Sequence, residues 1–150
     1  MKIKIFISIF ILWIIVVSMP VFSYAEESML YIITNEKNTV QSLSKHEIRN
    51  IFLGEIKSFP NGKSVSPVFH VKGSVSREVF MREIVRKNER KWRSHWARLL
   101  FTGRGLPPVE LENTDEVVNM VSHKQDSIGY FVGELKGHVG IKVLMEIPLN

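Results

Sequence analysis

The sequence predicts a single α/β domain in which a layered sheet is flanked by helices. The chain has 150 residues and is 45% hydrophobic, which suits one ordinary globular domain with a proper core. Short apolar runs rich in β-branched and aromatic residues alternate with longer stretches in which apolar residues recur at helical spacing. Strands separated by helices are typical of layered α/β folds.

The first 25 residues are predicted to be a secretory signal peptide. Two lysines precede an apolar run at residues 5–17 that no charge interrupts, and Ser23 and Ala25 place small residues where a signal peptidase cleaves. The run is shorter than the about 20 apolar residues of a spanning helix, and an uncleaved membrane anchor is the alternative. Cleavage after Ala25 would leave a domain of residues 26–150, for which we expect a periplasmic location.

Charge and cysteine content narrow the expected partners. Lys and Arg number 20 against 15 Asp and Glu, a formal net charge of +5, and there is no cysteine. An exported protein does not meet nucleic acid, so we expect no nucleic-acid partner, whereas anionic small molecules, lipid headgroups and acidic proteins remain. Without cysteine the chain forms no disulfide and carries no lipid-modified cysteine, which fits a bacterial periplasm.

The first half of the domain is predicted to contain two strands and one helix. Residues 29–34 are a β-branched and aromatic run, and residues 65–71 are a second one that follows an Asn-Gly turn. Ser44 with Glu47 three positions later is the capping-box pattern of a helix through Phe52, which Gly54 ends.

The second half is predicted to contain three helices and two strands. A turn of small residues opens a helix that runs to Val85, and residues 88–101 form the next helix. Thr114 or Asp115 is expected to cap a short third helix, and residues 127–132 and 140–144 are the expected last strands. On the helix of residues 88–101, the four residues expected to share one buried face are Trp92, Trp96, Leu99 and Leu100.

The turn at residues 73–77 is the strongest candidate binding site. It lies between a strand and a helix N-terminus, where unpaired backbone N–H groups suit a phosphate or carboxylate. Ser74 and Ser76 add hydroxyl donors, Gly73 frees the backbone, and Arg77 adds a charge that can hold two oxygens at once. The alternative is that Ser74 simply caps the helix.

A second candidate site follows the helix of residues 88–101. The glycine of Thr102-Gly103-Arg104 lets the backbone approach a ligand, and Arg104 supplies a cation. The alternative is a helix stop followed by a proline-stiffened loop. The basic stretch of residues 82–98, which also carries two glutamates, is expected to be a solvated helix face.

The sequence argues against catalysis and predicts no catalytic residue, metal or cofactor. Its five histidines lack the paired spacing of a zinc site, and structural zinc sites built on cysteine are excluded. A couple of His70 with Ser74, four residues later, is conceivable, but a buried histidine bonded to the backbone is the favoured interpretation. We expect a protein that is not an enzyme.

Several segments together resemble the phosphate-binding proteins of phosphate ABC transporters, in the type 2 periplasmic-binding-protein superfamily. Residues 43–59, LSKHEIRNIFLGEIKSF, resemble the family's L-S/T-x-x-x-I-x-x-I-F-L-G-K-I-x-x-W stretch. The turn and helix at residues 73–80 match its ligand-binding turn, and Ser127-Ile128-Gly129-Tyr130 match its late A-I-G-Y strand. The resemblance implies a periplasmic-binding-protein-like fold, and this chain is too short for more than one of the family's two lobes.

The resemblance also implies an anion site. The family's turn is Arg, three residues, then Ser-Gly-Thr, and the matching positions here are His70, Ser74, Val75 and Ser76, with Arg77 one residue later. Two hydroxyls are kept, while the arginine and glycine positions have changed. The serine loop of the other lobe has no counterpart unless Thr34 and Asn35, or the loop of Thr102, Gly103 and Arg104, form a second wall.

Two functions are therefore expected from the sequence. The first is an exported solute-binding-like protein that binds phosphate or a related small oxyanion weakly through Gly73, Ser74, Ser76, Arg77 and His70. The alternative is a non-catalytic periplasmic module that kept the fold, lost the ligand and docks onto a membrane transporter or sensor.

Overall fold

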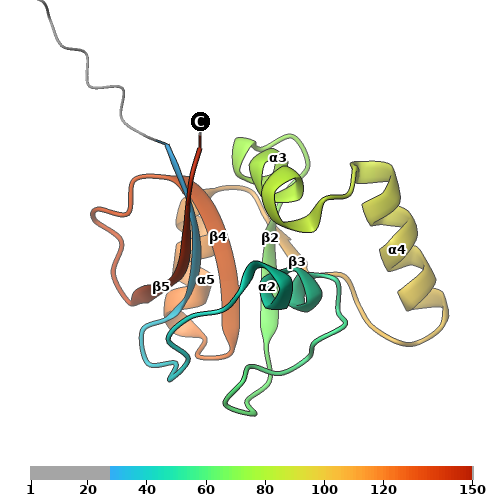
Figure 1. The fold of residues 1–150 in the computed structure, drawn as a ribbon, viewed down its shortest axis with the longest axis horizontal. Helices are drawn as coiled ribbons and strands as arrows, with labels where there is room; N and C mark the ends of the chain where they lie inside the picture. The colour runs from blue at the N-terminus through green and yellow to red at the C-terminus, as the bar shows by residue number, and fades with distance from the viewer. Residues whose placement is uncertain (1–27, 150) are drawn as a thin grey trace, which may run out of the picture.

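The computed structural model describes residues 28–149 and confirms the predicted α/β fold, a five-stranded sheet with helices on both faces (Figure 1). The predicted signal peptide lies outside the described residues. In residues 28–149 there is no helix with the length and apolar character needed to cross a membrane. The elements in chain order are β1 Met29–Asn35, α2 Lys45–Phe52, β2 Ser66–His70, α3 Val75–Phe80, the π-helix η1 Met81–Val85, α4 Glu89–Phe101, β3 Val109–Leu111, α5 Thr114–His123, β4 Ser127–Gly133 and β5 Ile141–Pro148.

The sheet is mixed, with strand order β3-β2-β4-β1-β5. β2 is parallel to β3 and to β4, as expected for strands joined through helices. β1 is antiparallel both to β4 and to β5, so the first strand of the described chain lies between the last two. The ends of the domain are therefore joined within one sheet.

The core lies on both faces of the sheet. Alternation along β1 sends Leu30 and Ile32 to one face and Ile33 to the other, and all three are fully buried. One face packs against α2, α3, η1 and α4, and the other packs against α5 (Figure 1). The aromatic centre of the larger cluster is a set of stacked and edge-on rings formed by Phe52, Phe69, Phe80, Trp92 and Tyr130.

The capping box predicted at the start of α2 is confirmed. The Ser44 hydroxyl accepts a hydrogen bond from the Glu47 backbone N–H, and the Glu47 carboxylate accepts one from the Ser44 backbone N–H at 2.8 Å. After the helix, Gly54 has φ +71°, a conformation that favours glycine. A Cβ there would lie 2.8 Å from the ring of Trp96, so Gly54 also lets α4 approach α2.

α3 continues directly into a π-helical turn. The backbone N–H of Arg86 donates to the carbonyl of Met81 at 2.7 Å, a bond of the i→i−5 type. Arg86 then ends the turn in the left-handed region at φ 55°, which is uncommon for a residue with a side chain. The prediction of a helix through Val85 is thus confirmed in extent, although its last turn is not α-helical.

The structure corrects four details of the sequence prediction. α5 is capped by Asn113, which accepts from the Glu116 N–H, rather than by Thr114 or Asp115. Leu100 is 52% exposed and does not share the buried face of Trp92 and Trp96. The sequence does not predict the edge strand β3, because three residues are too few to show an alternating pattern. The last strand runs to Pro148 rather than ending at residue 144.

Candidate functional site

The turn of residues 73–77 lies where the sequence places it, between the end of β2 and the start of α3. Gly73 has φ +92°, which turns the chain from the strand toward the helix. The Ser74 hydroxyl accepts a hydrogen bond from the Arg77 backbone N–H at 3.2 Å, so Ser74 is the N-cap of α3. Ser74 therefore caps the helix, which is the alternative role predicted from the sequence. The capping hydrogen bond occupies one acceptor lone pair of the Ser74 hydroxyl.

The Arg77 side chain is held by the protein's own carboxylates. Its Nε and Nη2 donate to the two oxygens of Glu89 at 2.7 and 3.0 Å, and its Nη1 donates to Glu110 at 2.7 Å. The same Nη1 donates to the backbone carbonyl of His70 at 2.7 Å. These bonds use four of the five N–H groups of the guanidinium, and the Arg77 side chain is only 3% exposed, so the group is engaged mainly inside the protein.

The environment of Arg77 keeps it charged. Burial by itself would lower the pKa of Arg77, but its hydrogen bonds to Glu89 and Glu110, together with the negative charge of both groups, outweigh burial and raise the pKa. The guanidinium carbon also lies 4.6 Å from the centre of the Phe69 ring, which adds a cation–π contact. The group is a buried cation that joins α3, α4 and β3.

Ser76 and His70 are also engaged inside the protein. The Ser76 hydroxyl accepts from the backbone N–H of Val132 at 3.0 Å, which ties α3 to β4. The His70 ring Nε2 lies 2.9 Å from the carbonyl oxygen of Tyr130, so this nitrogen must carry the proton and donate. The Tyr130 hydroxyl in turn accepts from the backbone N–H of His70 at 3.2 Å, and burial raises the pKa of that hydroxyl.

His70 is expected to make the protein less stable in mild acid. Burial lowers the pKa of His70, and the hydrogen bond to the Tyr130 carbonyl only partly opposes this. The unfolded chain, with a histidine pKa near 6.5, therefore binds a proton that the folded chain excludes, so stability is full above about pH 6.5 and falls below it. The loss is at most about 1.4 kcal/mol per pH unit.

The test of this prediction is His70→Gln, which keeps a side-chain N–H donor for the Tyr130 carbonyl but does not titrate. Urea unfolding of both proteins from pH 7 to pH 5 should give a flatter profile for the variant. Equal slopes in the two proteins would show that His70 does not cause the acid sensitivity.

Thr34 and Asn35 lie at the opposite end of the sheet from Ser74. Thr34 pairs with Ile128 at the start of β4, and its hydroxyl donates to the Ser127 carbonyl at 2.7 Å. The Asn35 amide donates to the carbonyls of Val121 and Ser122 at the end of α5. Ser127 pairs with Ser66 at the start of β2, so Thr34 and Asn35 lie near the start of that strand. The length of β2, about 15 Å, separates them from its other end, which leads to Ser74.

Thr102, Gly103 and Arg104 follow the far end of α4. Glu89, the first residue of α4, contacts Arg77, and the 13 residues of this helix rise by about 20 Å before Thr102. The Thr102 hydroxyl donates to the carbonyl of Arg98 within the last turn, and Gly103 has φ +65°. The structure brings together His70, Gly73, Ser74, Ser76 and Arg77, but places both suggested second walls elsewhere.

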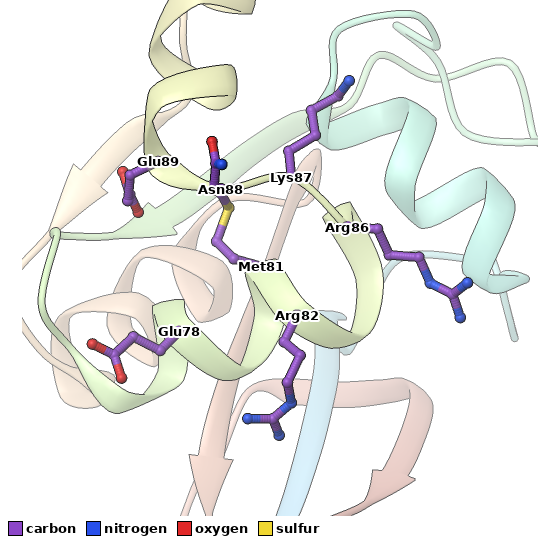
Figure 2. Close-up of a pocket in the computed structure, with 7 residues that line it drawn as sticks. All are labelled: Glu78, Met81, Arg82, Arg86, Lys87, Asn88 and Glu89. Carbon is purple, nitrogen blue, oxygen red and sulfur yellow. The ribbon is translucent and has the colours of Figure 1, made fainter.

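A cavity of about 410 Å³ lies between α3, η1 and the start of α4 (Figure 2). Met81 points into its centre, and the carboxylates of Glu78 and Glu89 lie on one side of it, whereas Arg86 points away toward α2. Glu89 separates this cavity from Arg77, since its carboxylate is bonded to the guanidinium. The lining residues are Glu78, Met81, Arg82, Arg86, Lys87, Asn88 and Glu89.

Sequence reasoning missed the two glutamates that neutralise Arg77. The sequence predicts Glu89 on a solvated helix face, because nothing in it distinguishes this residue from other acidic residues in a basic stretch. Glu110 lies in β3, which has no clear pattern. Both contacts depend on how α4 and β3 approach the end of β2, and the sequence does not show this approach.

The charged groups at the start of α3 are one guanidinium and the two carboxylates bonded to it, so their summed charge is negative. An anion beside Ser74 would approach the charges of Glu89 and Glu110 as well as that of Arg77. In the described range 28–149, no three histidine or carboxylate side chains gather in a way that could hold a metal ion.

Comparisons with known proteins place this fold among solved phosphate receptors. No protein-family model matches the chain, and no curated protein matches it. A candidate phosphate ABC transporter substrate-binding protein of Clostridium perfringens, solved with bound phosphate, superimposes with a TM-score of 0.62 at 17% identity. An ABC-type phosphate transport receptor of Vibrio cholerae gives 0.60 at 14%, and PstS of Borrelia burgdorferi gives 0.61 at 16%.

The superposition covers most of this chain but less than half of each receptor. It spans 79% of this chain in all three cases, and 45%, 46% and 47% of the Clostridium, Vibrio and Borrelia chains. At this level of identity the likeness shows the fold. The described domain is a mixed α/β unit of the kind found in phosphate-binding proteins, and these neighbours are binding proteins rather than enzymes.

Proposed function

We propose that this domain is an exported, non-catalytic module that works by docking to a partner and no longer carries phosphate. The observation behind the proposal is the closure of the turn by Arg77, Glu89 and Glu110. In a phosphate site, an arginine of this kind would present free donors to the anion. Here a bidentate carboxylate already fills the position that the anion would take on the guanidinium.

The energetics support the same proposal. An anion that displaced Glu89 from Arg77 would have to break two charge-assisted hydrogen bonds. The Glu89 carboxylate, which is 31% exposed, would then remain close to the negative charge of the anion. Each such bond is worth about 1.5 to 3 kcal/mol net, and association costs several kcal/mol more. Little free energy remains to hold phosphate at the turn.

Calorimetric titration of the purified protein with orthophosphate at low salt tests the proposal. We expect no binding tighter than about 1 mM. Glu110→Gln is expected to create measurable binding, because it removes one negative charge beside the guanidinium while the 45% exposed side chain keeps its shape. Glu112→Gln, an exposed glutamate beyond the end of the same strand, is the matched control and should change nothing.

Weak phosphate binding at the same turn is the second candidate function. Its support is the shared fold with a protein solved with bound phosphate, together with the hydroxyl of Ser74 at the start of α3. Binding near 0.1 mM that Ser74→Ala abolishes would favour this candidate over docking. Submicromolar binding would overturn both, because it requires a second wall around the anion.

A further inference from the structure

The end of α4 and the loop after it present apolar side chains to solvent. Leu100 is 52% exposed, Phe101 is 90% exposed and Leu106 is 75% exposed. Figure 1 shows α4 at one side of the domain, with this loop at the outer corner, on the side away from β5. Several exposed large apolar residues within one turn and one short loop indicate a surface that meets a partner. We call residues 98–106 the α4 corner.

Cations surround the α4 corner. Lys57, Arg98 and Arg104 line a shallow cavity of about 390 Å³ between this corner and the end of α2, together with one acidic residue, Glu55. The Lys57 ammonium donates to the Arg104 carbonyl at 2.9 Å. Within residues 28–149, neither guanidinium of the corner forms an ion pair with a carboxylate, so both charges are available to a partner.

The outer face of α4 extends this positive surface along the helix. Arg90, Lys91 and Arg93 are exposed, whereas Trp92 and Trp96 of the same helix are buried. The one acidic residue of the helix, Glu89, is bonded to Arg77. The three cations stand in the first half of α4, where the helix dipole disfavours positive charge. The fold itself therefore does not explain them.

We propose that the outer face of α4 and the α4 corner dock onto the anionic surface of a phospholipid bilayer. This inference rests on the proposed docking role and names what the domain docks to. Phe101 and Leu106 would insert at the level of the headgroups, and the five cations of this face, Arg90, Lys91, Arg93, Arg98 and Arg104, would contact lipid phosphates.

Shape and charge favour a bilayer over an acidic protein as the partner. Phe101 is 90% exposed and Leu106 is 75% exposed, and side chains so exposed need either a matching pocket or a deformable layer to be covered by a partner. The cations are spread over the length of α4, about 20 Å, which matches a continuous plane of negative charge. A bilayer satisfies both conditions without a dedicated pocket.

Co-sedimentation with vesicles tests the proposal. At low salt, the purified protein should bind phosphatidylcholine vesicles that contain about one third phosphatidylglycerol and should not bind phosphatidylcholine alone. About 0.5 M salt should release it, because the Debye length then falls to a few ångströms. Binding to both vesicle types alike, or to neither, would overturn the proposal.

Two pairs of variants locate the binding surface. Arg93→Glu should lower partitioning by more than tenfold, since each cation contributes about fivefold, and Phe101→Ser should lower it by about tenfold. The matched controls are Lys136→Glu and Val139→Ser, exposed residues in the β4–β5 loop on the opposite side of the domain. If the control variants lost as much vesicle binding as Arg93→Glu and Phe101→Ser, the result would contradict a binding surface on α4.

A third measurement separates the bilayer from a protein partner. A photo-crosslinking residue at position 101 should label lipid in cells. Labelling of one protein, with no vesicle binding by the purified domain, would overturn the bilayer proposal and leave the docking role intact. Tight phosphate binding in the calorimetric experiment would instead remove the docking role itself.

Discussion

Replacing Trp96 by alanine is expected to lower the free energy of unfolding by about 3 to 5 kcal/mol. Trp96 is 5% exposed, and its ring lies edge-on to Trp92 with the centroids 5.8 Å apart. Gly54 accommodates the same ring, so the truncation leaves a cavity between α2 and α4. The indole N–H is buried without a partner among the described residues, so packing carries the effect.

Urea unfolding measures the loss at Trp96. Leu100→Ala is the control on the same helix, and its 52% exposed side chain should change stability by less than about 0.5 kcal/mol. An unchanged unfolding midpoint in Trp96→Ala, together with lost binding of a ligand or partner, would show that the residue serves a binding surface instead of the core.

Replacing Arg77 by methionine is expected to cost about 2 to 4 kcal/mol. Breaking a buried ion pair usually costs about 3 to 5 kcal/mol, but Glu89 and Glu110 are 31% and 45% exposed, so water can solvate part of their charge once Arg77 is gone. Methionine keeps much of the packing on Phe69 and loses the charge and the bond to the His70 carbonyl.

Arg82→Met is the matched control for the Arg77 variant. Arg82 is 62% exposed and pairs with Glu83 at 2.8 Å, and a surface pair of this kind contributes about 0 to 1 kcal/mol. Thermal and urea unfolding of both variants should therefore differ clearly. If Arg77→Met were as stable as the wild type and also bound phosphate more weakly, Arg77 would be a ligand residue rather than a structural cation.

The elements of the fold could be predicted from the sequence where local patterns decide them. The capping box at Ser44, the aromatic strand before Asn35 and the helix of Trp92 and Trp96 all follow from residue spacing. The order and direction of the strands could not be predicted in this way. β1 pairs with residues about 100 positions later in the chain, and no local sequence pattern indicates which strand is its partner.

The turn at the start of α3 shows the same limit at the candidate site. Its position, its small residues and its N-cap were visible in the sequence. What Arg77 does depends on Glu89 and Glu110, which arrive from two other elements. Spacing within the segment cannot show whether its arginine faces solvent or a carboxylate, and that difference decides between a ligand site and a structural contact.

The place of β1 between β4 and β5 has a kinetic consequence. The strand at residues 29–35 has no neighbour until residues 127–148 are present, so its sheet contacts close loops of roughly 100 residues. Contacts so distant in sequence slow folding and delay it until the whole chain is available. A nascent chain of this topology cannot complete its sheet until residues 127–148 have been synthesised, and a chain truncated before Ile141 would leave one edge of β1 unpaired.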